Sequence, residues 1–362
     1  MYHLVLPCLM LRNKYKKNKI KTMSSDPPLE VPAVVDTPTE EKEQKEQQQP
    51  DATQGRNFRE PSAAGHVFNV ILFRPDLKAA KSTHEELLGH ELARDVLTAL
   101  PAQFRINVPF AVYDQGPIGS CTANATCAAF KLQIPAGKSS NPSRMFQYYV
   151  VRAMKHWIGQ EGAIIDDCYR AMQGVGMCQE PTWPYIIAKE NVKPSKAAYT
   201  QAPQSRISTW GGISGTGSTF VSNIKKVLSV RKPVVIGIAV YDSFESDTVA
   251  RTGMVPMPNT RTESLLGGHA VCVVGWDDTK SAFLVMNSWG TRWGTAQPGD
   301  SSGRRGFFWL PYAYVGNSRL CDEALFSNGD VITVPHRAPA PSRSQTQRGP
   351  RPRPGQRIVW KK

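Results

Sequence analysis

One stretch of the chain combines a nucleophilic residue type with the start of a helix. Residues 112–125 read VYDQGPIGSCTANA, in which Gly116, Pro117 and Gly119 favour a turn and the alanines after Cys121 favour a helix. A thiol in the first turn of a helix faces unpaired N–H groups and the positive end of the helix dipole, and both favour the thiolate. The pattern therefore predicts that Cys121 is a nucleophile.

A cysteine nucleophile needs a base and a third group that orients the base. Segments 268–276 and 282–288 predict a β-hairpin with its turn centred on Asp278, and His269 and Asn287 each lie nine residues from that centre. Residues equidistant from a turn lie opposite each other in an antiparallel pair, unless a bulge shifts the register. We therefore expect Asn287 to bond one ring nitrogen of His269 and to leave the other facing the sulfur.

Two further side chains complete the predicted site. Gln115 precedes Cys121 by six residues, where a turn brings its side-chain amide back beside the sulfur. The alternative is that Gln115 only caps the turn. Trp289 follows Asn287 closely and is expected to cover the hydrogen bond between His269 and Asn287, a role compatible with core packing.

The elements that must position these residues change in type along the chain. Helical patterns come first, at 121–133, 142–154 and 164–172, the last closed by Gly174, and another follows at 220–230. Strand patterns then occupy 233–240, the hairpin, 307–310 and 324–326, while 245–266 is predicted to be a loop. Helices first and strands later indicate an α+β protein with two lobes.

The basic charge belongs to the ends of the chain. The net charge is +14, and residues 1–22 and 335–362 carry six and eight Lys/Arg with no acid, so the rest is neutral overall. We predict a disordered basic leader (1–22), a disordered polar linker (23–65) and a disordered Pro/Arg-rich tail (331–362). Residues 66–99, with a strand pattern at 67–73 and a helical one at 85–100, are a pro-segment or an N-terminal elaboration of a domain at 100–330.

The seven cysteines argue for a reducing compartment. Their number is odd and no C-x-x-C occurs, which disfavours a tetrathiolate zinc site and a dense disulfide framework. Cys168 and Cys178 are expected to be free thiols, with a disulfide between them as the alternative. No span reaches the roughly 18 apolar residues of a transmembrane helix, and the apolar start of the chain precedes its positive charges, unlike a secretory signal. We expect an intracellular location such as the cytoplasm.

These residues resemble the papain-like cysteine peptidases, in an atypical variant such as those of bacteria and large DNA viruses. The resemblance covers about residues 100–327 and rests on these motifs in order: Gln115 with Gly119-Ser120-Cys121, Lys232-Pro233-Val234, Gly268-His269-Ala270-Val271, Gly275-Trp276, Asn287-Ser288-Trp289-Gly290 with Trp293-Gly294, and Gly306 to Tyr312. Two departures stand out, because the family signature has a cysteine in place of Ile118 and an aromatic residue in place of Thr122. If the source is viral, a virion-associated location is the alternative to the cytoplasm.

The resemblance implies a two-lobe fold, with a helical N-terminal lobe, a β-barrel-like C-terminal lobe and the site in the cleft between them. It implies that Cys121 is the nucleophile, His269 the base and then the acid, Asn287 the residue that orients the imidazole, and Gln115 with the Cys121 N–H the oxyanion hole. Neither a metal nor an organic cofactor is implied.

The sequence therefore predicts a cysteine endopeptidase or exopeptidase that acts on protein or peptide substrates as a monomer. Two alternatives use the same residues: a binding protein with a retired site that docks through its basic tails, and a thiol acyltransferase or deamidase. The tails themselves are expected to contact a protein, or a polyanion non-specifically.

Overall fold

The computed structural model describes residues 66, 82–84, 86–88, 99–135, 138, 140–328 and 332–333. The predicted leader and linker (1–65), the strand at 67–73, most of the helix at 85–100 and nearly all of the tail lie outside the described residues.

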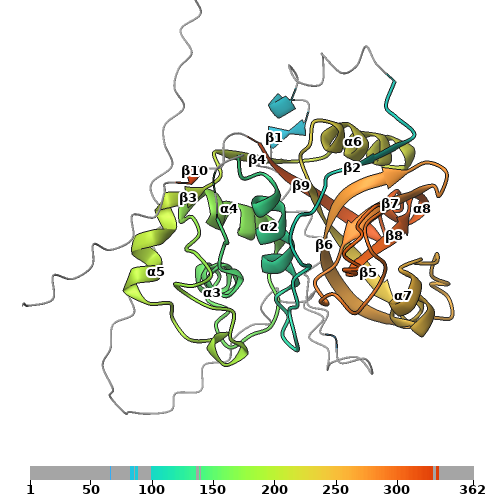
Figure 1. Cartoon of the computed structure of the whole chain (residues 1–362). Coiled ribbons are helices and arrows are strands. Elements are labelled where there is room, and N and C mark those ends of the chain that lie inside the picture. Colours follow the sequence, from blue (N-terminus) through green and yellow to red (C-terminus); the bar gives the residue numbers. More distant parts are fainter. Residues whose placement is uncertain are drawn as a thin grey trace, which may run out of the picture.

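The first half of the described chain forms a helical lobe (Figure 1). Its helices are α2 (Cys121–Leu132), α3 (Arg144–Met154), α4 (Ile165–Gly174) and α5 (Lys196–Gln201). Serine side chains cap two of them, because Ser143 accepts from the Phe146 N–H at the start of α3 and Ser195 accepts from the Ala198 N–H at the start of α5. The predicted helices at 121–133, 142–154 and 164–172 are thus confirmed.

The end of α4 differs from the prediction. Gly174 belongs to the helix, and Gly176 takes the left-handed conformation instead, with a φ of 87°. A side chain cannot replace the hydrogen there, since a Cβ on Gly176 would lie 2.1 Å from the carbonyl oxygen of Ala202. Tertiary packing therefore decides which of the two glycines turns the chain.

The second half of the chain forms a largely antiparallel sheet. Among the described residues its strand order is β1-β4-β9-β5-β6-β7-β8, where β1 is Ser82–Thr83 and β4 is Thr209–Gly212, and β2 (Gln103–Arg105) pairs with β6 as well. The central strands are β5 (Val234–Tyr241), β6 (Leu265–Asp277), β7 (Ala282–Met286), β8 (Phe307–Pro311) and β9 (Cys321–Asn328). They confirm the strands predicted at 233–240, 307–310 and 324–326, and the predicted hairpin is formed by β6 and β7.

The remaining elements complete the fold. They are β1 (Ser82–Thr83), β2 (Gln103–Arg105), β3 (Ser205–Arg206), β4 (Thr209–Gly212), β10 (Ile332–Thr333), α6 (Gly217–Ser229), α8 (Tyr312–Val315), and the 3-10 turns η2 (Ile187–Lys189), η3 (Ala202–Gln204) and η4 (Asp242–Glu245). Among the strands that the structure describes, β1 is the one that pairs in parallel in the main sheet, next to β4.

The prediction that 245–266 is a loop is wrong at both ends. Helix α7 (Asp247–Thr252) forms because the Ser246 side chain accepts from the Val249 N–H and Gly253 ends the helix at a φ of 70°. Strand β6 begins at Leu265, inside the predicted loop, because Leu265 pairs with Tyr241 of β5. A bulge between Val240 and Tyr241 separates this pair from the rest of the ladder. A six-residue helix has too little periodicity to be recognised in the sequence.

The hairpin register also differs from the prediction. A turn centred on Asp278 would place Met286 opposite Ala270, whereas Met286 pairs with Cys272. At the turn Asp277 pairs with Ala282 rather than with Thr279, a shift of three residues, and the bulge at Val274 reduces this shift to two towards Met286. The predicted register is therefore wrong by two residues, and such an even shift keeps each side chain on its face of the sheet.

Helix α2 lies on the side of the helical lobe that faces the sheet, packed against α3 and α4 on one side and β6 on the other (Figure 1). Its residues from Cys121 to Phe130 are all buried, so the helix has no solvent-facing side along this length. Its alanines and short polar residues allow neighbours to approach on every side. In the part of the chain that the structure describes, no helix has the length and apolar character needed to cross a bilayer.

Candidate active site

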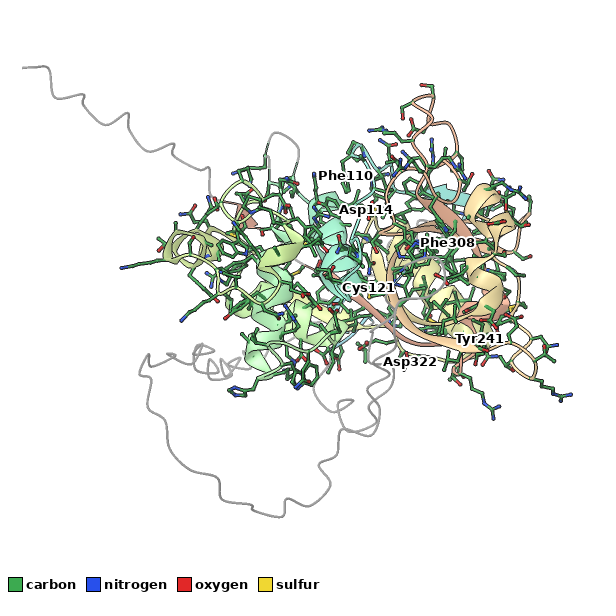
Figure 2. The ribbon with its side chains drawn as sticks, turned by 90° about the horizontal axis from the view of Figure 1, so that it is seen from below. Phe110, Asp114, Cys121, Tyr241, Phe308 and Asp322 are labelled. Carbon is green, nitrogen blue, oxygen red and sulfur yellow. The ribbon has the colours of Figure 1, made fainter. Side chains whose placement is uncertain are left out.

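Cys121 is the first residue of α2 and lies where the helical lobe meets the sheet (Figure 2). The Ser120 side chain before it does not cap the helix; its hydroxyl is 2.5 Å from the Tyr185 hydroxyl. Because Tyr185 donates its own proton to the Gln115 carbonyl at 2.8 Å, Ser120 is the donor of the pair. Ser120 therefore does not occupy the N–H groups in the first turn of α2, the turn that begins with Cys121.

Gln115 is held from the other lobe. Its backbone N–H donates to the Ser288 carbonyl at 2.8 Å, and the Gly290 N–H donates to the Tyr113 carbonyl at 2.9 Å. The Ser288 hydroxyl donates to Gln115 Oε1 at 2.6 Å, and Gln115 Nε2 donates to the Ile118 carbonyl at 3.0 Å. The Gln115 amide is thus oriented within the turn that leads into α2, and one of its two N–H groups is left for another acceptor.

The predicted contact between His269 and Asn287 is present. His269 Nε2 lies 2.8 Å from Asn287 Oδ1, and that oxygen also accepts from the Ser288 N–H at 2.8 Å. An atom that accepts from a backbone N–H is the amide oxygen, so Nε2 of His269 must be the donor. In a neutral imidazole the unprotonated nitrogen is then Nδ1, which is the atom able to take up a proton.

Burial sets the protonation state of His269. The side chain is fully buried, and this burial lowers its pKa to about 4, against an opposing effect of the Asn287 hydrogen bond and a smaller lowering by His66. The imidazole is therefore neutral near pH 7, the form in which Nδ1 is able to accept a proton.

Trp289 lies against the His269 ring, as predicted, with ring centroids 5.0 Å apart. The ring of His66 also stacks on Trp289, with ring centroids 3.7 Å apart and an interplanar angle of 4°. His66 Nδ1 is also 2.7 Å from Glu245 Oε1. The sequence carries no signal for this contact, because His66 precedes the predicted domain and has no motif around it.

The remaining described cysteines have a different environment from a reactive thiol. Cys127, Cys168, Cys178, Cys272 and Cys321 are all buried and free, so the two predicted free thiols at 168 and 178 are confirmed. Burial raises the pKa of Cys127 well above its usual range and the pKa of Cys168 and Cys178 to about 12. These thiols stay protonated and act as small apolar side chains.

The sequence did not predict two residues from other loops that hydrogen-bond to the turn before α2. Glu161 Oε2 accepts from the Gly119 N–H at 2.5 Å, and Tyr185 bonds the Gln115 carbonyl, as described above. Tyr185 stands in the sequence Trp-Pro-Tyr, which predicts only a loop, and Glu161 stands in a polar segment. Neither position shows a pattern that connects it to Cys121.

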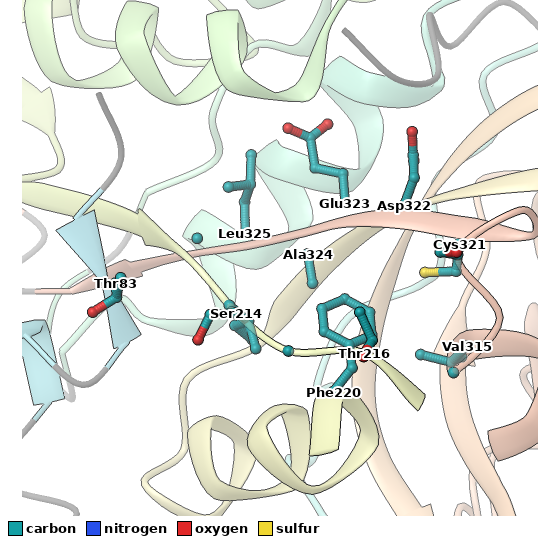
Figure 3. Close-up of a pocket in the computed structure, with 15 residues that line it drawn as sticks. Thr83, Ser214, Thr216, Phe220, Val315, Cys321, Asp322, Glu323, Ala324 and Leu325 are labelled. Carbon is teal, nitrogen blue, oxygen red and sulfur yellow. The ribbon is translucent and has the colours of Figure 1, made fainter. Parts of the chain in front are cut away.

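A pocket of about 420 Å³ lies elsewhere, beside β9 and residues 212–216 (Figure 3). Ala324 and Phe220 face each other within it, while the carboxylates of Asp322 and Glu323 point to the other side of β9. Cys121, His269, Asn287 and Gln115 do not line this pocket. Over the described ranges, no group of three or more His, Cys, Asp or Glu residues is arranged to hold a metal ion.

The sequence matches known cysteine proteases. A model of the papain family cysteine proteases matches residues 105–297. An uncharacterized peptidase C1-like protein of Acanthamoeba polyphaga mimivirus is 36% identical over 218 residues, which cover 58% of this chain and 67% of that protein. Cathepsin L of Sarcophaga peregrina is 28% identical over 195 residues, which cover 51% of this chain and 52% of that protein.

Solved structures agree with these matches. Xylellain, a cysteine protease from Xylella fastidiosa, is similar with a TM-score of 0.57 and 33% identity, over 67% of this chain and 89% of that one. A digestive procathepsin L2 of Tenebrio molitor has a TM-score of 0.53 at 19% identity, over 71% and 77% of the two chains, and shows the likeness of the fold. Because the helical lobe, the antiparallel sheet and the sequence matches all agree, the chain belongs to the papain family and is a cysteine peptidase with the two-lobe fold of that family.

Proposed function

We propose that the chain hydrolyses peptide bonds with Cys121 as the nucleophile, His269 as the base and acid, Asn287 as the residue that orients His269, and Gln115 as an oxyanion donor. The observation that carries the proposal is the bond of 2.8 Å between His269 Nε2 and Asn287 Oδ1, next to the Ser288 contact that holds Gln115. Helix α2, which begins at Cys121, packs on β6, the strand of His269.

The proton transfers follow from the hydrogen bonds. His269 Nε2 donates to Asn287, so Nδ1 accepts the proton of the Cys121 thiol and forms a thiolate–imidazolium pair. The thiolate attacks the substrate carbonyl carbon, and the carbonyl oxygen becomes an oxyanion. The imidazolium then gives its proton to the leaving amine as the C–N bond breaks, which leaves an acyl group on the sulfur. Water, deprotonated by His269, hydrolyses this thioester and restores the thiol.

Oxyanion stabilisation requires donors that are already oriented before the charge develops. The Gln115 amide meets this requirement, because Ser288 and Ile118 hold its oxygen and one of its N–H groups. The Cys121 backbone N–H belongs to the first turn of α2 and is the second donor of the proposal.

Labelling by a thiol-directed epoxide tests the nucleophile. Cys121→Ala should abolish both peptide hydrolysis and labelling, whereas Cys127→Ala, the matched control in the same helix, should keep both. Labelling that persists in Cys121→Ala would refute the assignment. The mass of the product separates hydrolysis from the other thiol chemistries, since acyl transfer gives a ligated product and deamidation gives a gain of about one dalton.

The action on protein substrates follows from membership of the family, but the other partners remain proposals. Only the sequence supports a monomeric state, a pro-segment at 66–99 and contacts of the basic tails with protein or polyanion. A reducing compartment is proposed on the cysteine pattern and on the likeness to a viral relative.

A further inference from the structure

One peptide unit in the turn before α2 is bonded at both ends. The carbonyl oxygen of Ile118 accepts from Gln115 Nε2 at 3.0 Å and from the Ser120 N–H at 2.8 Å. The N–H of the same peptide unit, which belongs to Gly119, donates to Glu161 Oε2 at 2.5 Å. A peptide unit is planar, so the group that fixes the direction of its N–H also fixes the direction of its carbonyl. Glu161 therefore controls the acceptor of the Gln115 amide.

Glu161 is itself held in place by the helical lobe. The Tyr148 hydroxyl donates to the same carboxylate oxygen at 3.1 Å and accepts from the Gly162 N–H at 3.2 Å. Burial raises the pKa of Tyr148, so the phenol stays protonated and remains a donor. The Arg152 guanidinium lies 3.8 Å from the Tyr148 ring centroid and donates to the Gln160 carbonyl at 3.0 Å. The residues on either side of Glu161, Gln160 and Gly162, are thus both hydrogen-bonded to side chains of α3.

We propose that Glu161 is a positioning residue for peptide hydrolysis: its carboxylate holds the Ile118–Gly119 peptide, and through it the Gln115 amide, in the orientation that stabilises the oxyanion. The inference rests on the proposed function of Gln115 and Cys121. It adds a residue that lies 42 positions from Gly119, in the loop between α3 and α4.

The bond from Gly119 to a carboxylate is charge-assisted and therefore stronger than a bond between neutral groups. Without it, only the Gln115 amide and the Ser120 N–H hold the Ile118–Gly119 peptide, and glycine tolerates the backbone angles of the reversed orientation. A turned peptide points its carbonyl away from Gln115 Nε2, and the amide keeps only its contact with Ser288. The substrate oxyanion then meets a donor that must be reoriented during the reaction.

Two reactions of the Cys121 thiol distinguish a positioning role of Glu161 from a general loss of structure at the site. Peptide hydrolysis builds an oxyanion, whereas alkylation by iodoacetamide forms a C–S bond with loss of iodide and builds none. In the full-length chain, Glu161→Ala should lower kcat for a peptide substrate about tenfold or more, a part of the 10²–10³ lost when an oxyanion donor is removed. The rate constant for alkylation of Cys121 should stay within about twofold of the wild type, and KM should change little.

The matched control is Glu190→Gln. Glu190 lies near Glu161, since burial and then the charge of Glu161 raise the pKa of Glu190, but it is Glu161 that accepts from the Gly119 N–H. It should therefore keep kcat near the wild-type value, while Glu161→Gln, which retains a neutral acceptor, should fall between the wild type and Glu161→Ala. If Glu161→Ala does not fold, the comparison of Glu161→Gln with Glu190→Gln decides.

Three results would overturn the inference: an unchanged kcat in Glu161→Ala, an equal loss of hydrolysis and alkylation, or a loss in Glu190→Gln as large as that in Glu161→Gln. A failure of the proposed function looks different. In that case Cys121→Ala still hydrolyses the substrate, or the wild type with a reactive Cys121 hydrolyses none, and the role of Glu161 falls with it.

Discussion

The Ser288 hydroxyl donates a hydrogen bond of 2.6 Å to the side-chain oxygen of Gln115, across 173 positions of the sequence. Ser288 also follows Asn287 directly, and its N–H donates to the same Asn287 oxygen that His269 bonds. One dipeptide after β7 thus orients both the amide of the proposed oxyanion hole and the imidazole of the proposed base. A small displacement of this dipeptide would misalign both groups together.

Ser288→Ala should lower kcat and leave KM nearly unchanged. The substitution leaves Gln115 Oε1 buried without its donor, and a neutral hydrogen bond contributes about 1 kcal/mol, which corresponds to about a fivefold change in rate. Steady-state kinetics on a peptide substrate measure both constants. The control is Ser229→Ala on α6, where the lost hydroxyl donates to the Lys226 carbonyl. A rise in KM at constant kcat would contradict a role limited to the transition state.

Asn287→Ala should weaken activity far more than folding. The imidazole of His269 loses the acceptor that fixes its tautomer and ring orientation, and a misplacement of about 1 Å is able to cost about a hundredfold in rate. The free energy of unfolding should fall by about 1–3 kcal/mol, because a buried donor is left unsatisfied. Kinetics and denaturant unfolding on the same sample measure the two effects. If activity declines only as the folded fraction declines, Asn287 has a structural role alone. Asn259→Ala, an exposed amide that accepts from the Arg261 N–H, is the control.

The buried neutral His269 should make stability depend on pH. Its pKa is about 4 in the native state and about 6.5 in an unfolded chain, so between these values the unfolded state binds a proton that the native state does not. The contribution of His269 to stability is therefore fully present above pH 6.5 and is lost as the pH drops towards 4, by up to about 3 kcal/mol. Denaturant unfolding of Cys121→Ala, which avoids self-cleavage, should show this loss, and Cys121→Ala/His269→Gln should lack that part of it. Equal pH dependence in the two variants would exclude His269 as the cause.

Removing the His66 ring should increase activity on extended peptides. His66 stacks on Trp289, whose ring lies against His269, and it also pairs with Glu245. A substrate that needs the surface of Trp289 must displace this ring, so kcat/KM for a long peptide should rise in His66→Ala and, less strongly, in Glu245→Gln. The rate for a small thiol reagent should change less. A lower kcat/KM in both variants would mean that His66 supports the site instead of covering it.

The sequence by itself determined the local parts of this protein. Helix α2 begins at Cys121 and strand β6 carries His269, as the turn residues, the alanines and the β-branched run predict. These features depend on neighbours within a few positions, so the printed residues are sufficient to recognise them. The contact between His269 and Asn287 was also predicted, because an even shift of register conserves the face of each side chain.

Only the tertiary structure decided which distant groups meet. The bulge at Val274, the bond of Glu161 to Gly119 and the stacking of His66 on Trp289 join segments whose local patterns carry no mark of each other. A glutamate in a polar loop has the same sequence signature whether water or a backbone N–H satisfies it. The path of the loop determines which of the two partners the glutamate meets. That path depends on packing across the whole chain rather than on local propensity.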